Sequence, residues 1–107
     1  MKLTLTEIKI QVALGTFDLY NYRELEHIEN KEVLTFFAFC SDVVLRRFAA
    51  VNRYTPFSVH QKQYNEDPDF LVKECAWEHV RSRYVRRYSK EPPTPLWRTT
   101  HFDLPTT

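Results

Sequence analysis

The side chains best suited to bind an anion gather in one short segment. Residues 81–90 contain five cations and two tyrosines. A guanidinium fork binds carboxylate or phosphate through two parallel hydrogen bonds, and a tyrosine ring can stack on a base. At helical spacing Arg81 lies apart from the others, and Tyr88 lies beside them. The cations that share one face are Arg83, Arg86, Arg87 and Lys90. This stripe predicts a surface for an anionic partner.

A solvated helix end is the alternative interpretation of the same segment. Basic side chains in the last turn of a helix are stabilised by the helix dipole, and Glu74 and Glu78 are placed to pair with Arg81. The charge distribution fits both interpretations, since residues 1–45 carry a net charge of −3 and residues 46–107 one of +4. The second half can attract an anionic partner or the first half of its own domain.

The C-terminal tail is a second candidate binding element. Pro92, Pro93 and Pro95 exclude a helix and favour a stiff, extended chain. Trp97 and Arg98 follow, and both residue types are common anchors of interfaces. Either the tail docks on a partner or it packs back on its own domain, and both interpretations stay open here.

The sequence gives little support for a metal site or a catalytic site. Cys75 and His79 are four residues apart, so a helix would place them on one face as half of a zinc site. No second pair has matching spacing. No nucleophile has a local base signature, and the single glycine, Gly15, excludes a glycine-rich phosphate loop. We therefore expect a non-enzymatic protein with no catalytic residue, no cofactor and no metal.

The elements that must position these side chains are predicted to be mainly α. With one glycine, the chain lacks the turn residues of a multi-strand antiparallel sheet. We expect a small bundle of three to four helices over residues 1–91, followed by the extended tail 92–107. The expected helices are 5–14, 31–53 as one buried central helix, and 67–88, with a short one at 22–28. Residues 55–66 are expected to form a loop.

Two segments leave an alternative open. Residues 7–14 alternate between apolar and polar side chains, and residues 33–40 form a short apolar run. Strands there would give an α+β fold, with Ser41 capping a helix that starts at Asp42. Arg46 and Arg47 lie within the expected central helix 31–53, where they either extend to its rim or pair with acids such as Glu24 or Glu26.

Composition bounds the class of protein. A hydrophobic share of 43% and an aromatic share of 15% over 107 residues indicate one folded domain. Cys40 and Cys75 lie in apolar or helical contexts, which is typical of thiols in a reducing compartment. No segment reads as a signal peptide or a membrane span. We therefore expect a cytoplasmic protein with no membrane association.

The function predicted from the sequence is that of a small interaction or regulatory protein. It would bind a partner protein with an acidic surface through the basic helix end and the aromatic tail. The candidate contact residues are Arg83, Arg86, Arg87, Tyr88, Lys90, Trp97 and Arg98. The alternative is a nucleic-acid-binding module that uses the same cations. Self-association is also expected, because a small domain so rich in aromatic residues is short of interior to bury them.

Overall fold

The computed structural model describes residues 4–18 and 29–98, and this part of the chain is helical without strands. The labelled helices are α1 (Leu5–Leu14), α2 (Lys31–Phe39), α3 (Val43–Val51), α4 (Phe57–Glu66) and α5 (Phe70–Tyr88). The mainly α prediction is thus confirmed, and the strand alternative for residues 7–14 and 33–40 is wrong. The expected number of three to four helices is too low, since the described residues form the five helices α1 to α5. The helix predicted at 22–28 lies outside the described residues.

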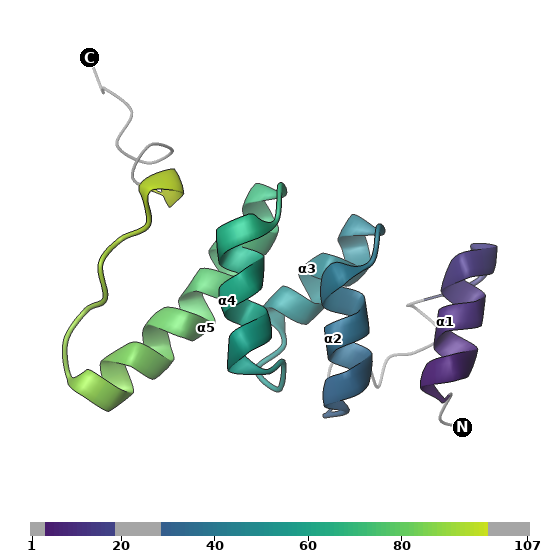
Figure 1. Ribbon diagram of the computed structural model, residues 1–107, viewed down its shortest axis with the longest axis horizontal. Coiled ribbons are helices and arrows are strands. Elements are labelled where there is room, and N and C mark those ends of the chain that lie inside the picture. Colours follow the sequence, from purple (N-terminus) through teal and green to yellow (C-terminus); the bar gives the residue numbers. More distant parts are fainter. Residues whose placement is uncertain (1–3, 19–28, 99–107) are drawn as a thin grey trace, which may run out of the picture.

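The helices form two hairpins, α2–α3 and α4–α5, that pack side by side. Contacts between α3 and α5 join the hairpins on one side, and α2 meets α4 on the other. Figure 1 shows α1, α2 and α4 in front and α3 and α5 behind. α1 lies at one end of the 49 Å long axis, and the C-terminal end of α5 lies at the other.

α1 has the boundaries and the caps that its sequence predicts. The Thr4 side chain accepts a hydrogen bond from the Glu7 backbone N–H at 3.2 Å, which satisfies a first-turn donor. Gly15 closes the helix in the left-handed region, with φ 71°. Ile8 on this helix is buried against the core, so the hydrophobic positions of α1 serve a helix face.

The predicted single helix 31–53 is wrong, because the chain breaks at Cys40–Asp42 into α2 and α3. Cys40 is extended, and the Asp42 carboxylate accepts a hydrogen bond from Val44 N–H at 2.9 Å as the N-cap of α3. Such short polar side chains compete with helix continuation by bonding the backbone locally. The break coincides with the Ser41–Asp42 helix start of the strand alternative, but the residues before it are helical.

The break also changes which side chains of α3 face inward. A continuous helix would bury Val44 and Val51 with Phe37, yet they are 52% and 59% exposed. Leu45 and Ala49 are buried instead. α3 starts anew after the chain reverses, so the helical spacing of buried positions in α2 does not predict which positions of α3 are buried.

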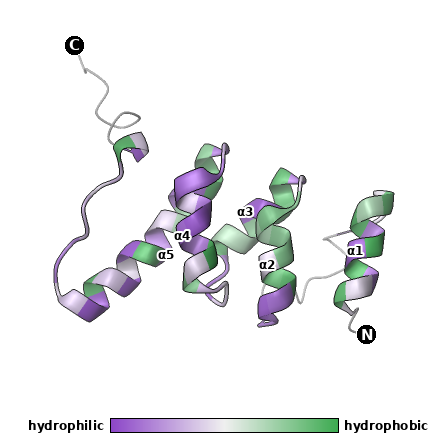
Figure 2. Ribbon diagram, viewed as in Figure 1, coloured by the Kyte–Doolittle hydropathy of each residue, from purple (hydrophilic) through white to green (hydrophobic). Residues whose placement is uncertain are grey.

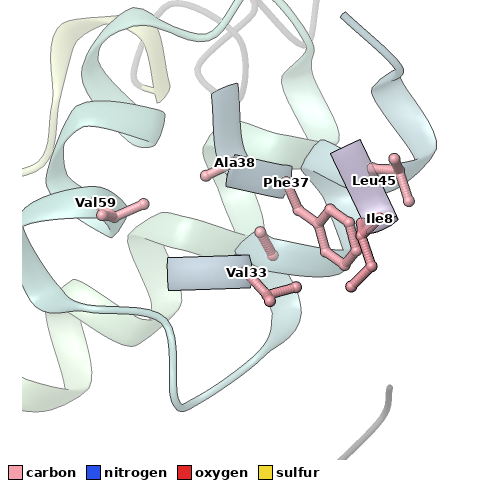
Figure 3. Close-up of a cluster of buried hydrophobic side chains, with 7 residues drawn as sticks. Ile8, Val33, Phe37, Ala38, Leu45 and Val59 are labelled. Carbon is pink, nitrogen blue, oxygen red and sulfur yellow. The ribbon is translucent and has the colours of Figure 1, made fainter. Parts of the chain in front are cut away.

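The main core cluster draws side chains from four helices. Phe37 lies at its centre, fully buried, with Phe48 edge-on at a centroid distance of 6.0 Å. Figure 3 shows Ile8, Val33 and Val59 of this cluster, from α1, α2 and α4. Figure 2 shows the matching hydropathy, with α1 and α2 largely apolar and α4 largely polar.

Residues 55–66 are not the predicted loop, since most of them form α4. Its inward face consists of Val59, His60 and Gln63, all buried, so two of its three core positions are polar. The sequence of α4 therefore has no apolar periodicity, although one face of the helix is packed in the core. Pro56 stands at its N-cap, where a fixed φ suits the start of a helix.

α5 ends at Tyr88 as predicted but begins three residues later than Asp67. Asp69 is the N-cap and accepts a hydrogen bond from Val72 N–H at 3.0 Å. Asp67 instead binds Arg46 of α3 at 2.9 Å, and its other oxygen accepts from Asp69 N–H at 2.8 Å. Asp67 therefore ties the turn between α4 and α5 to α3.

A second ion pair reinforces the first. Arg47 binds both carboxylate oxygens of Asp69, at 3.0 and 2.8 Å, and this contact lowers the pKa of Asp69. The partners proposed from the sequence, Glu24 and Glu26, lie outside the described residues. Consecutive arginines on α3 thus hold two aspartates at the start of α5.

A buried polar cluster lies where α3, α4 and α5 meet. His60 is fully buried, and its Nε2 donates to the Ala49 carbonyl oxygen at 3.3 Å. Thr55 Oγ1 donates to the same oxygen at 2.6 Å. The His79 ring stacks on the His60 ring at 4.6 Å with an interplanar angle of 2°. Burial, followed by the nearby His79, lowers the pKa of His60 to about 4.

This histidine predicts a specific loss of stability in acid. Unfolded His60 gains a proton near its ordinary pKa of 6.5, whereas the folded form gains it only near 4. Stability is therefore full above pH 6.5, falls as the pH falls, and levels off below 4. The shift corresponds to about 3 kcal/mol of the free energy of unfolding. Urea titrations at several pH values measure it.

The control for this prediction is His60→Gln, which keeps a donor for Ala49. We expect the variant to be less stable at pH 7 but to lose much less stability between pH 6.5 and 4. Asp69 does not confuse the measurement, because its contribution is lost only as the pH falls through the ordinary aspartate value of 3.8 and below. Parallel pH profiles for both proteins would contradict the assignment to His60.

Candidate partner-binding surface

A cluster of cations joins the C-terminal half of α5 to the turn before α4. We call it the basic surface, and its members are Arg53, Arg83, Arg86, Arg87 and Lys90. Arg83 connects the two segments, since its Nη2 donates to the Arg53 carbonyl oxygen at 3.3 Å. The Arg83 guanidinium also lies 5.6 Å from the centroid of the Phe57 ring at the start of α4.

The pairing of arginines separates this surface from the rest of the molecule. Arg46, Arg47, Arg81 and Arg98 each bind a carboxylate. Within residues 4–18 and 29–98, none of the five cations of the basic surface does so. Arg81, which the sequence placed off the stripe, is held by Glu78 and Glu91. The basic surface therefore presents positive charge that no described carboxylate neutralises.

Aromatic rings hold several of these cations. Arg53 lies 4.9 Å from the centroid of the Tyr54 ring and donates to its hydroxyl at 2.8 Å. Arg87 lies 5.7 Å from the Tyr88 ring, which packs on Tyr84 at 4.6 Å. Cation–π contacts restrict where a guanidinium points, so less freedom is lost when a ligand binds. Tyr88 remains 53% exposed.

The structure brings together five of the residues singled out in the sequence. Arg83, Arg86, Arg87, Tyr88 and Lys90 all lie at the C-terminal end of α5. Sequence reasoning missed Arg53, Tyr54 and Phe57, which complete the surface from a segment 30 residues away in the chain. The only signal for them was the Arg–Tyr pair just before Pro56, and no periodicity connects that pair to α5.

Trp97 and Arg98 lie elsewhere, near the N-terminal end of α5. Residues 91–98, here called the strap, run back from the end of α5 (Figure 1). Residues 91–95 are without regular structure, but residues 96–98 form a helical turn, so the prediction of an extended tail is wrong there. Trp97 packs edge-on against Phe70 at a centroid distance of 6.1 Å, and Lys73 Nζ lies 5.4 Å from its ring. Arg98 Nε donates to the two carboxylate oxygens of Glu74, at 3.1 and 3.2 Å. The first part of the tail thus packs on its own domain.

The residues considered for metal binding have other contacts. His79 stacks on His60, and its Nε2 donates to the Val51 carbonyl oxygen at 2.8 Å. Cys40 and Cys75 are free thiols whose pKa values are raised by burial. In the part of the chain that the structure describes, no three potential ligands form a metal-binding group. Nor is any helix there long and apolar enough to cross a membrane.

A hollow of about 300 Å³ lies between α2, α3 and α4. Its lining includes Phe39, Lys62, Glu66 and the Arg46–Asp67 pair. Two positive and two negative side chains line the hollow, so neither sign of charge predominates there. The basic surface is the better candidate for recognition.

No protein family, no curated protein and no solved structure shows a significant match to this chain.

The docked tail predicts unequal effects for neighbouring substitutions. Trp97→Ala removes the packing on Phe70 and Lys73 and should lower the free energy of unfolding by about 1–2 kcal/mol. Leu96→Ala is the matched control, because Leu96 is 83% exposed and its truncation should change stability by less than about 0.5 kcal/mol. Chemical denaturation of both variants decides, and equal effects would argue against docking through Trp97.

Proposed function

We propose that this protein is a non-enzymatic interaction module whose basic surface binds an acidic segment of a partner protein. The observation that carries the proposal is the contrast between paired and unpaired arginines. Each arginine that the structure describes outside the basic surface binds a carboxylate within the domain, whereas Arg53, Arg83, Arg86 and Arg87 have none among the described residues. A partner that supplies carboxylates would complete the same type of contact.

Charge alone does not give such a complex its affinity. An exposed ion pair contributes only about 0.2–1 kcal/mol, and salt screens it. Phe57 and Tyr88 are 38% and 53% exposed beside the cations, so a partner with apolar side chains between its carboxylates would also bury ring surface. We therefore expect an acidic segment that carries aromatic or aliphatic residues.

Binding of single-stranded nucleic acid is the second candidate function. The exposed Tyr88 ring next to Arg87 favours it, because bases stack on such rings while guanidinium groups bind phosphates. Nucleic acid differs from an acidic peptide in a measurable way. The logarithm of its binding constant falls linearly and steeply with the logarithm of the salt concentration as counterions are released.

The test reverses three exposed charges of the basic surface. The variant carries Arg86→Glu, Arg87→Glu and Lys90→Glu. Its binding to a fluorescent peptide of glutamates around a central tryptophan is measured by anisotropy. We expect at least about tenfold weaker binding than for the unchanged protein, because several ion pairs are replaced by repulsion. Circular dichroism confirms that the variant is folded.

A matched control carries the same change in net charge elsewhere. Lys9→Glu, Lys31→Glu and Lys62→Glu reverse three exposed lysines outside the basic surface. This control should lose less than about half as much binding free energy, since only long-range attraction is reduced. Equal losses in both triple variants would overturn the proposal. Tighter, strongly salt-dependent binding of oligothymidylate of equal charge would favour the nucleic-acid function instead.

A further inference from the structure

We propose that the strap is exchanged between two copies of this chain, so that Trp97 and Arg98 of each copy dock on α5 of the other. The inference is independent of the basic surface. It rests on the conformation of the hinge at Ser89, on the length of the strap, and on the chemistry of the side chains of α5 that bind the strap, here called the dock.

The hinge adopts a conformation that its residue disfavours. Ser89 has φ 56° and ψ 30°, and it is the only non-glycine residue with positive φ in the described ranges. Its backbone N–H donates to the Val85 carbonyl oxygen at 2.8 Å and ends α5 in a left-handed turn. Glycine usually occupies this position, since a Cβ atom is strained there. Releasing the strap from its own α5 allows Ser89 to leave this region.

The strap is only just long enough to reach its dock. α5 covers about 22 Å between Lys73 and Tyr88 at the rise of an α-helix. The nine steps from Tyr88 to Trp97 span about 25 Å, because the chain up to Pro95 is at most extended polyproline-type chain and residues 96–98 form a helical turn. Residues 91–95 must therefore stay extended in the closed form, in which the strap docks on its own α5, and Pro92, Pro93 and Pro95 keep them extended when the strap is released. A preorganised segment loses little freedom when it docks on another molecule.

The dock consists of side chains that another copy presents equally well. Phe70 and Lys73 contact Trp97, and Glu74 binds Arg98. Arg81 adds a contact at the other end of the strap, with Glu91 at 2.8 Å. These contacts are made by pairs of residues of one sequence, so they form within a copy or between copies with the same geometry.

A second copy is the occupant that fits best. Each copy offers one strap and one dock, so a reciprocal exchange retains both sets of contacts in a closed two-fold dimer. The exchanged form also relieves the strain of two hinges. What opposes it is the loss of freedom on association, so the balance depends on protein concentration. Strained hinge segments are a known origin of such exchange.

The decisive experiment uses two complementary charge reversals, Glu74→Arg and Arg98→Glu. Alone, each variant places like charges together at its dock, whether the strap docks within a copy or between identical copies. When the two variants are mixed, every strap finds a dock of opposite charge only in the heterodimer. Light scattering coupled to size exclusion should show monomers for each variant and a dimer for the mixture.

The double variant Glu74→Arg with Arg98→Glu in one chain is the control. It restores the pair within each copy and should behave as the unchanged protein. A mixture that stays monomeric up to millimolar concentration overturns the exchange. Dimers of equal amount in each variant alone also overturn it, because they would form through another surface.

Hinge variants give a second test that leaves the dock intact. Ser89→Gly accepts positive φ, and Ser89→Val resists it more strongly than serine. We expect the association constant of the dimer to be at least about tenfold lower for the glycine variant than for the valine variant. The reason is that two hinges are strained in the closed copies of the valine variant and are relaxed in those of the glycine variant. Equal constants for the two variants would exclude the hinge as the driving element.

Discussion

The ion pair between Arg46 and Asp67 fixes how the two helical hairpins meet. Both side chains are largely buried, with 15% and 6% of their surfaces exposed, and the guanidinium also donates to the carbonyl oxygens of Cys40 and Ser41. One side chain therefore closes the α2–α3 turn and holds the α4–α5 turn. A buried charge of this kind is tolerated only with its partner and its hydrogen bonds in place. The start of α5, and hence its direction, follows from it.

The direction of α5 determines what stands at its other end. Because α5 packs along α3, His79 reaches the Val51 carbonyl oxygen and Arg83 reaches that of Arg53. These contacts place the cations of α5 next to the turn before α4, where Phe57 begins the helix. The basic surface is thus a consequence of this packing, since Arg53 and Tyr54 come from the turn between the two hairpins and meet Phe57 and the cations of α5 in the second hairpin.

The parts of the fold that were predictable from sequence are those with local causes. The caps at Thr4 and Gly15 define α1 by short-range hydrogen bonds, and the stripe of arginines on α5 follows from helical spacing. The parts of the fold that depend on tertiary contacts could not be predicted from the sequence. Apolar residues stand on both sides of Ser41 and Asp42 although the helix does not continue. The inward face of α4 is mostly polar because His60 and Gln63 find acceptors on α3. Arg53 joins the basic surface only through packing.

The cations that bind no described carboxylate gather towards one end of the molecule. The C-terminal end of α5, with Arg86 and Arg87 in its last turn, lies at the opposite end of the 49 Å long axis from α1 (Figure 1). A positive patch of this kind turns a molecule in the field of a charged partner before the two surfaces touch. At low ionic strength the protein therefore approaches an anion with the end of α5 leading, and fewer of its encounters are wasted on the wrong face.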